Sequence, residues 1–391
     1  MSKRKTPVLR FKGFHNDWEQ RKLGGYIEVT KNKNKNMLLY PAFSISNIKG
    51  FVAQEEQFGK DNTYSKTDKS TNYIVEPGMF AYNPARINVG SIAYQNQHEP
   101  VLVSSLYEIF KVKSEIDDSF LMNWFKTSLF NNQVKRLEEG GVRQYFFIDK
   151  MQETKIGLPS ISEQKNISKI LKLINKNLDL QQQKLDNLII LKRAYLSMLF
   201  PTKEENNPKI RFAKFSNNWE KRKFNTFVER ISNNTSCNFP NVTYDDIDSK
   251  NGILNKKVSQ LSRGKHGILF QKNDILYGKL RPYLNNIIKA SFKGIAVGDF
   301  WILRANEDPD FFLALIYTSR YKYITSISTG SKMPRADWKL VSNYNFYIPS
   351  IEEQKWIGNM ISKLSYLILL EQKRILLFKK IKHFLLQNIF I

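Results

Sequence analysis

Cysteine and histidine are scarce in this chain of 391 residues, which has one cysteine, Cys237, and four histidines. A single cysteine excludes an intrachain disulfide and fits a reducing compartment, so a cytoplasmic protein is expected. The histidines lack the spacing typical of zinc sites, and no metal is expected. No apolar run is long enough to span a bilayer, and the first residues lack the apolar core of a secretory signal. These absences predict no membrane partner.

Several sequence motifs of catalysis are also missing. No G-x-x-x-x-G-K-[ST] loop occurs, which argues against ATP binding, and no Gly-rich cofactor loop follows a candidate strand. An adenine methyltransferase needs an Asn/Asp-Pro-Pro-aromatic element, but NPAR at 83–86 and DPDF at 308–311 lack the second proline. The acidic stretch YDDID at 244–248 is interpreted as a solvated loop rather than a nuclease centre. A chain without chemistry or cofactors of its own is therefore expected.

Basic residues, by contrast, are abundant. The chain has 61 Lys and Arg against 36 Asp and Glu, a formal net charge of +25. Such an excess points to a polyanionic partner, because lysine and arginine release counterions from phosphates. On charge alone, nucleic acid is the first expectation and an anionic membrane the second, but no membrane partner is expected for the reasons given above. The excess is greater in residues 201–350 than in residues 1–160, and the segments between and after them add less.

An internal duplication organises the chain. RFKGFHNDWEQRKL at 10–23 returns as RFAKFSNNWEKRKF at 211–224 with eight of fourteen positions identical, and LPSISEQK at 158–165 returns as IPSIEEQK at 348–355 with six of eight. A period of half the chain predicts two tandem modules rather than a solenoid. The first pair, called the leading segments, is nearly invariant and is interpreted as an aromatic framework that seats each module near the end of the opposite helix. Weaker matches in the same order are 44–52 with 246–254, 79–86 with 274–281, and 120–128 with 311–319.

Two long helices are predicted to start near Ile161 and Ile351, where each Ser-x-x-Glu has the spacing of a capping box. Apolar residues then recur in alternating steps of four and three, and polar residues interrupt both seams at the same two places. Matched interruptions favour a coiled coil between the helices over separate packing of each on its own module. If the pair is antiparallel, Gln181 and Glu371 could lie opposite each other and fix the register. The seams are Ile167, Leu171, Ile174, Leu178, Gln181, Leu185, Leu188, Lys192, Tyr195 and Leu199, and Ile357, Ile361, Leu364, Ile368, Glu371, Ile375, Phe378, Lys382, Leu385 and Ile389.

The predicted fold class is α+β. Each module has alternating apolar segments and turn residues typical of short strands, ahead of its long helix. We expect two tandem domains of mixed strands and helices, separated by two helices that pair as an antiparallel coiled coil with pseudo-twofold symmetry. The predicted boundaries are 1–160, 161–200, 201–350 and 351–391.

This arrangement resembles the DNA specificity subunit of type I restriction–modification systems over essentially the whole chain. The resemblance rests on LPSISEQK and IPSIEEQK, the two heptad helices, and the paired WEQRKL and WEKRKF. It implies that residues 1–160 and 201–350 are target recognition domains, each reading one half of a split double-stranded DNA sequence. It further implies that two methyltransferase subunits bind around the spacer helices with S-adenosylmethionine, and that two translocase–nuclease subunits use ATP and Mg²⁺. This chain would supply sequence choice alone.

Two loops in each module are candidates for DNA contact, since base edges and phosphates are bound by exposed Arg, Lys, Asn and Gln. The first is AYNPARINVG with its counterpart LYGKLRPYLNN, and the second is EGGVRQYFF with its counterpart TGSKMPRADW. An ordinary β-turn with exposed charge is the alternative for each. The candidate residues are Tyr82, Arg86, Arg143 and Gln144 in the first module, and Tyr277, Lys279, Arg281, Lys332 and Arg335 in the second.

Two other functions are consistent with the composition. One is a stand-alone DNA methyltransferase or nuclease with two recognition domains, against which the missing motifs argue. The other is a coiled-coil scaffold that binds RNA, which would show no preference for duplex DNA. The sequence leaves open the DNA target and the gap between its halves, because the modules differ most where bases would be read.

Overall fold

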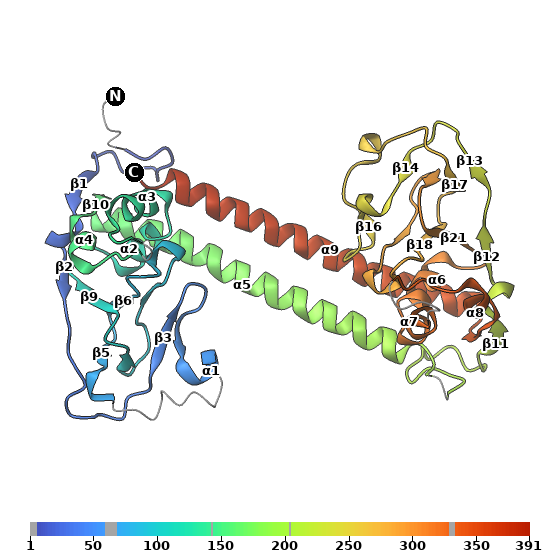
Figure 1. The fold of residues 1–391 in the computed structure, drawn as a ribbon, viewed down its shortest axis with the longest axis horizontal. Coiled ribbons are helices and arrows are strands. Elements are labelled where there is room, and N and C mark those ends of the chain that lie inside the picture. Colours follow the sequence, from blue (N-terminus) through green and yellow to red (C-terminus); the bar gives the residue numbers. More distant parts are fainter. Residues whose placement is uncertain (1–5, 59–68, 142–143, 203–204, 328–332) are drawn as a thin grey trace. The chain divides into compact units, whose positions relative to one another are not determined.

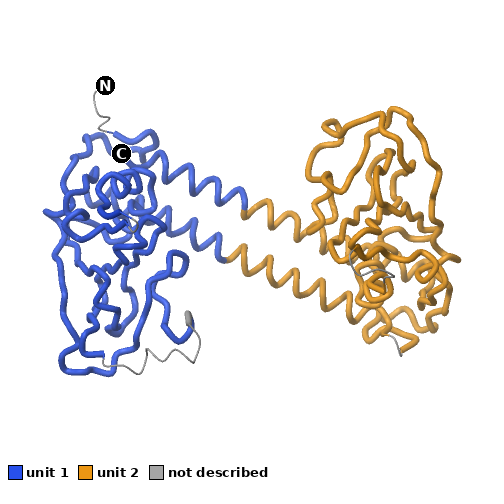
Figure 2. Tube along the Cα trace, in the orientation of Figure 1, with its two compact units in different colours: residues 1–179, 376–391 blue, residues 180–375 orange. Residues whose placement is uncertain are grey.

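The computed structural model describes residues 6–58, 69–141, 144–202, 205–327 and 333–391 (Figure 1). The chain divides into two compact units (Figure 2). Unit 1 comprises residues 1–179 and 376–391, and unit 2 comprises residues 180–375. Each unit therefore combines one module with parts of both long helices, α5 (Ile161–Met198) and α9 (Ile351–Asn388). Both helices begin at the predicted residues.

Unit 1 is built on a four-stranded antiparallel sheet in the order β2-β9-β6-β7. Aromatic side chains fill its core, where Phe80 stacks on Phe110 with ring centroids 5.1 Å apart. The pair β1-β10 joins the start of the module to its end, and the hairpin β3-β4 and the pair β5-β8 complete the strands. The strands are β1 (Glu19–Lys22), β2 (Ile27–Val29), β3 (Phe43–Ser46), β4 (Gly50–Ala53), β5 (Tyr73–Val75), β6 (Met79–Tyr82), β7 (Ile92–Tyr94), β8 (Val101–Val103), β9 (Glu108–Val112) and β10 (Lys155–Leu158). The helices are α1 (Gln54–Phe58), α2 (Asp118–Trp124), α3 (Ser128–Leu137) and α4 (Ile148–Glu153).

Unit 2 repeats this plan with the sheet β12-β21-β18-β19, the closing pair β11-β22 and the hairpin β15-β16, and adds a second sheet, β13-β17-β20-β14. The strands are β11 (Glu220–Lys223), β12 (Val228–Ile231), β13 (Asn234–Thr235), β14 (Asn241–Val242), β15 (Ile247–Asp248), β16 (Ile253–Leu254), β17 (Gly267–Phe270), β18 (Ile275–Gly278), β19 (Ile287–Lys289), β20 (Gly294–Ala296), β21 (Phe300–Ala305) and β22 (Asn345–Ile348). The helices are α6 (Pro309–Ile316), α7 (Ser319–Ser326) and α8 (Trp338–Asn343).

The hairpins β3-β4 and β15-β16 confirm the weaker sequence matches between the modules. Gly50 and Gly252 occupy the same aligned position and both have positive φ, +71° and +65°. Glycine adopts this conformation without the steric penalty of a Cβ, which explains why both copies keep it. The two units thus repeat one design, as the internal duplication of the sequence predicts.

The long helices pair in antiparallel fashion, which each unit shows by itself. In unit 1, the early α5 residue Leu171 shares a hydrophobic cluster with Leu385 near the end of α9. In unit 2, Tyr195 near the end of α5 and Leu199 directly after it share a hydrophobic cluster with Ile361 early in α9. Most of the predicted seam is buried. Its buried apolar members are Ile167, Leu171, Ile174, Leu185, Leu199, Ile357, Ile361, Leu364, Ile368, Ile375 and Ile389.

The leading segments are joined to the long helices by ion pairs that the sequence did not predict. Arg10 binds Glu163 in the first turn of α5 through two hydrogen bonds of 2.8 Å, and Arg211 binds Glu353 of α9 in the same way at 2.8 and 2.7 Å. Each glutamate carboxylate is therefore engaged by an arginine. The Ser160 hydroxyl accepts the Glu163 amide at 3.4 Å, so one half of the predicted capping box is present.

The glutamine of the P-S-I-x-E-Q-K motif ties each long helix to its module. Gln164 donates to the carbonyls of Pro159 and Glu115, both at 3.0 Å, and accepts the amide of Asp117 at 2.9 Å. Gln354 likewise donates to the Pro349 carbonyl at 3.0 Å. Both glutamines are buried, so these bonds replace the water that their amides lose. The repeated motif is thus a structural joint.

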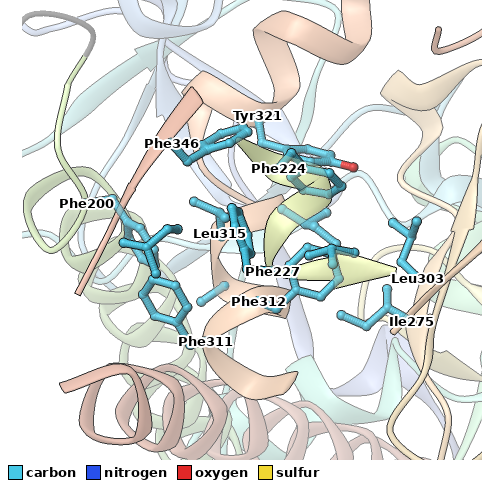
Figure 3. Packing of buried hydrophobic residues seen from close by; sticks show 14 of the residues in the cluster. Phe200, Phe224, Phe227, Ile275, Leu303, Phe311, Phe312, Leu315, Tyr321 and Phe346 are labelled. Atoms are coloured by element: carbon cyan, nitrogen blue, oxygen red, sulfur yellow. The ribbon is translucent and has the colours of Figure 1, made fainter. Parts of the chain in front are cut away.

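Aromatic residues of each module meet the end of the helix that comes from the other module. In unit 1, Phe120 packs against Phe390 and Trp18, with ring centroids 5.1 and 6.0 Å apart. In unit 2, Phe200 stacks on Phe311 at 5.4 Å (Figure 3). Burial of each such ring contributes about 2–3 kcal/mol, which anchors the helix ends.

The backbone continues this contact, because the Leu9 amide donates to the Asn388 carbonyl at 3.0 Å and the Ile210 amide to the Met198 carbonyl at 3.1 Å. Leu9 and Ile210 directly precede the leading segments, so each segment begins beside the end of the opposite helix, as the sequence predicted.

Candidate nucleic-acid interface

The predicted tyrosines lie in the core. Tyr82 ends β6 and is fully buried against Phe110, and Tyr277 in β18 is 2% exposed and stacks on Trp301 at 5.5 Å. Burial raises the pKa of Tyr277 to about 12 and also raises the pKa of Tyr82. The prediction that these rings contact DNA is therefore corrected. They belong to strands that are buried on both faces, and the loop begins only after them.

The charged residues that follow these strands are at the surface. Arg86 is exposed at the start of a short 3₁₀ helix, Ile87–Val89, after a turn in which Asn83 accepts the Ala85 amide at 3.0 Å. Arg281 is exposed at the corresponding place, ahead of the 3₁₀ helix Pro282–Leu284.

The backbone of Arg281 is strained, with φ +49° and ψ 62°. This left-handed conformation costs a non-glycine residue about 1–2 kcal/mol. The following proline also restricts its backbone. Its amide donates to the Pro334 carbonyl at 2.8 Å, and this bond helps to hold the conformation. Strain of this kind concentrates at functional sites, so Arg281 is a stronger candidate than the sequence indicated.

In the second candidate loop, Arg143 and Lys332 lie outside the described residues. Gln144 is exposed, and its side chain donates to the Gly140 carbonyl of its own loop at 2.8 Å. Arg335 is exposed and forms an ion pair with Asp299 at 2.9 Å.

The two candidate loops of each unit are held together by main-chain hydrogen bonds. In unit 1, the Phe146 amide donates to the Pro84 carbonyl at 3.0 Å. In unit 2, the Ala336 amide donates to the Lys279 carbonyl at 2.9 Å, and Leu280 forms a bridge with Arg335. Each unit thus presents its two loops as one surface, which the sequence could not show because about fifty residues separate them.

Asp299 organises the unit 2 surface and was missed by the sequence analysis. Its carboxylate pairs with Arg335, and Lys279 lies 3.6 Å away. Its carbonyl accepts the Tyr244 hydroxyl at 2.6 Å, and the same hydroxyl accepts the Leu280 amide at 3.3 Å. Burial raises the pKa of Tyr244 to about 12. Nothing in the sequence around Asp299 indicates which loop it faces, so only the fold reveals this role.

The acidic stretch that contains Tyr244 is structural. Asp246 accepts the Thr243 amide at 2.8 Å and pairs with Lys256 at 2.7 Å. Over the described ranges, no three His, Cys, Asp or Glu side chains gather as they would to hold a metal ion. No helix in those ranges has the length and apolarity to cross a membrane.

The polar residues of the helix seams have different surroundings. Glu371 is 3% exposed and pairs with Lys184 of α5 at 2.6 Å and with Arg374 of its own helix at 3.2 Å. Gln181 Oε1 is buried and has no hydrogen-bond partner among the described residues. The cross-helix bond of Glu371 therefore goes to Lys184, three residues beyond the predicted Gln181.

Comparisons with known proteins agree with this architecture. The family described as "Type I restriction modification DNA specificity domain" matches residues 15–189 and again residues 211–377. The MjaVIII type I restriction enzyme specificity subunit of Methanocaldococcus jannaschii is 21% identical over 386 residues, covering 91% of this chain and 88% of that protein. The EcoDI specificity subunit of Escherichia coli is 21% identical over 408 residues, covering 93% and 83%.

A solved structure shows the same fold over the whole chain. The S subunit of a type I restriction–modification system from M. genitalium matches with a TM-score of 0.62 and 14% identity, and the match covers 99% of both chains. Because the family matches both modules and most of the chain, this chain belongs to the type I restriction–modification DNA specificity family.

Proposed function

We propose that this chain is the sequence-specific double-stranded DNA-binding subunit of a type I restriction–modification complex, in which each module reads one half of a bipartite target. The observation that carries the proposal is the convergence of two loops in each unit, at positions where the modules differ in sequence. The family match to both modules supports it. Two diverged readers would address two different half-sites, so the target need not be palindromic.

The chemistry of the converged loops suits a DNA groove. Arg86, Lys279, Arg281 and Arg335 offer guanidinium and ammonium donors for phosphates and guanine edges. In unit 2, Asp299 holds Arg335 and Lys279 in place before DNA arrives. Because Arg335 is 56% exposed in its side chain, exchange of the carboxylate for a phosphate requires little desolvation.

The chain would act through partners that carry out the chemistry. Two methyltransferase subunits with S-adenosylmethionine would dock on the long helices, and two translocase–nuclease subunits with ATP and Mg²⁺ would complete the complex in the cytoplasm. In unit 2, the helices leave apolar side chains at the surface that fit such docking. A hollow of about 690 Å³ is lined there by Leu191, Trp356, Met360 and Leu367, among others, and Trp356 is 48% exposed.

The proposal is tested by sequencing methylated positions in a host that expresses this chain with its methyltransferase subunit. A bipartite motif with an unspecified gap is expected, and a continuous motif would contradict two separate readers. Arg335→Ala should weaken binding to the target duplex. It should relax discrimination at one position, by about 1–3 kcal/mol, if Arg335 reads a base, and weaken all sequences alike if it contacts a phosphate.

A further inference from the structure

Each helix seam contains a lysine at the same position, Lys192 in α5 and Lys382 in α9. Both are half-buried, and each lies in the unit of the other module, Lys382 in unit 1 and Lys192 in unit 2. A lysine in a coiled-coil seam reduces apolar burial and stability. Its presence in both copies therefore points to a role other than helix packing.

In unit 1, Lys382 of α9 and the exposed Lys126, which follows α2, line one hollow of about 780 Å³. Lys49 at its rim pairs with Glu56 at 2.7 Å, and the lining carboxylate Asp118 is hydrogen-bonded to Tyr94. Among the described residues, neither Lys126 nor Lys382 forms an ion pair. Amide side chains contribute much of the remaining lining: Asn47, Asn88, Asn96, Gln97 and Asn131.

In unit 2, Lys192 of α5 has an equivalent neighbour. Its ammonium lies 5.3 Å from the centre of the Tyr317 ring, and the exposed Lys322 of α7 lies 5.8 Å from the same ring. Tyr317 occupies the aligned position of Lys126, at the end of the helix before the Thr-Ser that caps the next. Each unit therefore has one lysine of a long helix and one lysine of its module around the same corner of the fold, although the module lysine comes from a different position in each unit.

Like charges held together in this way are unfavourable in the free protein. Desolvation lowers the pKa of Lys126 and of Lys192, and the neighbouring Lys382 and Lys322, respectively, lower them further. Desolvation likewise lowers the pKa of Lys382, although the charge of Asp179 acts in the opposite direction. An anion between the two ammonium groups would remove the repulsion.

We propose that Lys126 with Lys382, and Lys192 with Lys322, each bind backbone phosphates of the DNA that the adjacent module reads. This inference rests on the proposed function. In unit 1, the location supports it, because Asn88 lines the same hollow and lies in the 3₁₀ helix that directly follows Arg86. A duplex on the converged loops would therefore pass next to this lysine pair. The contacts add affinity and position without adding sequence preference.

The test compares the salt dependence of duplex binding for the full chain, purified with its co-purifying subunits. In the double variant Lys126→Gln, Lys382→Gln, the slope of log affinity against log salt should fall by about 1.8, from about 0.9 for each lost phosphate contact. Between 50 and 200 mM salt, the unaltered protein should then lose about tenfold more affinity than the variant. The ratio of target to non-target binding should stay the same. The Lys→Arg pair should restore the slope.

The matched control is Lys135→Gln with Lys379→Gln, which removes the same charge from exposed positions on α3 and α9 of unit 1. An unchanged slope in the Lys126 and Lys382 variant, or an equal fall in the control, would overturn the inference. So would a failure of the Lys→Arg pair to restore the slope. If the unaltered complex shows no preference for its target duplex, the proposed function itself fails, which the first titration reveals before any variant is made.

Lysine acylation, measured by mass spectrometry, distinguishes binding of DNA phosphates from binding of free phosphate. Duplex in chloride buffer should protect Lys126, Lys382, Lys192 and Lys322, and inorganic phosphate at the same phosphate concentration should protect them much less. Equal protection by inorganic phosphate would assign the pairs to a small free anion and refute the DNA contact.

Discussion

Replacement of Arg10 by methionine should destabilise unit 1 severely. The Glu163 side chain is 2% exposed and that of Arg10 is 15% exposed, so the substitution leaves a carboxylate buried without its cation. Removal of one partner from a buried ion pair typically costs about 3–5 kcal/mol. The second substitution Glu163→Gln removes the charge, so the double variant should recover most of that loss and remain about 1 kcal/mol less stable than the parent.

Amide hydrogen exchange provides the measurement, because peptides from unit 1 and unit 2 report their opening free energies separately. Arg211→Met should give the same loss in unit 2, where the Arg211–Glu353 side chains are 17% and 1% exposed. Glu352→Gln breaks the solvent-exposed pair with Lys214 and should change stability by about 0.5 kcal/mol or less. A loss below about 1 kcal/mol for Arg10→Met, or no recovery in the double variant, would refute the role assigned to this ion pair.

Three further predictions concern the strained loop, the buried tyrosine and the helix seam. Arg281→Gly should stabilise unit 2 by up to about 1–2 kcal/mol by relief of the left-handed strain, yet weaken duplex binding, as thermal unfolding and a binding titration would show. Tyr277 should ionise only near its raised pKa of about 12. Its contribution to the stability of unit 2 is therefore complete below pH 10 and is lost as the pH rises through 12. The difference in near-UV absorbance titration between the parent and Tyr277→Phe would show this ionisation. Gln181→Leu with Glu371→Leu should change helix register or partner assembly more than stability, and unaltered assembly in sedimentation would contradict it.

The sequence predicted the framework better than the reading surface. The seams, the helix starts and the two-module plan follow from periodicity and repetition, which are local or regular signals. The prediction that Tyr82 and Tyr277 contact DNA was wrong. The sequence does not distinguish a buried tyrosine within a strand from an exposed tyrosine in the following loop, because it does not show that both faces of the strand are covered. Asp299 and the lysine pairs depend on contacts between distant segments, which no local pattern encodes.

The Arg10–Glu163 ion pair and the candidate DNA-contact loops lie in different segments of the first module, so a domain exchange can replace the loops and keep the ion pair. Replacement of residues 1–157 by another recognition domain should change one half of the target only, but a donor without an arginine at the position of Arg10 would leave Glu163 buried and unpaired. An exchange of residues 24–154 keeps Arg10, Trp18 and the β1-β10 pair, so it should preserve stability and still transfer the candidate loops with Arg86 and Gln144. Methylome sequencing of a host with the hybrid should show a new first or second half-site, while the other half stays the same. A change in both halves would mean that the readers are coupled through the helices, and no change would place recognition outside residues 24–154.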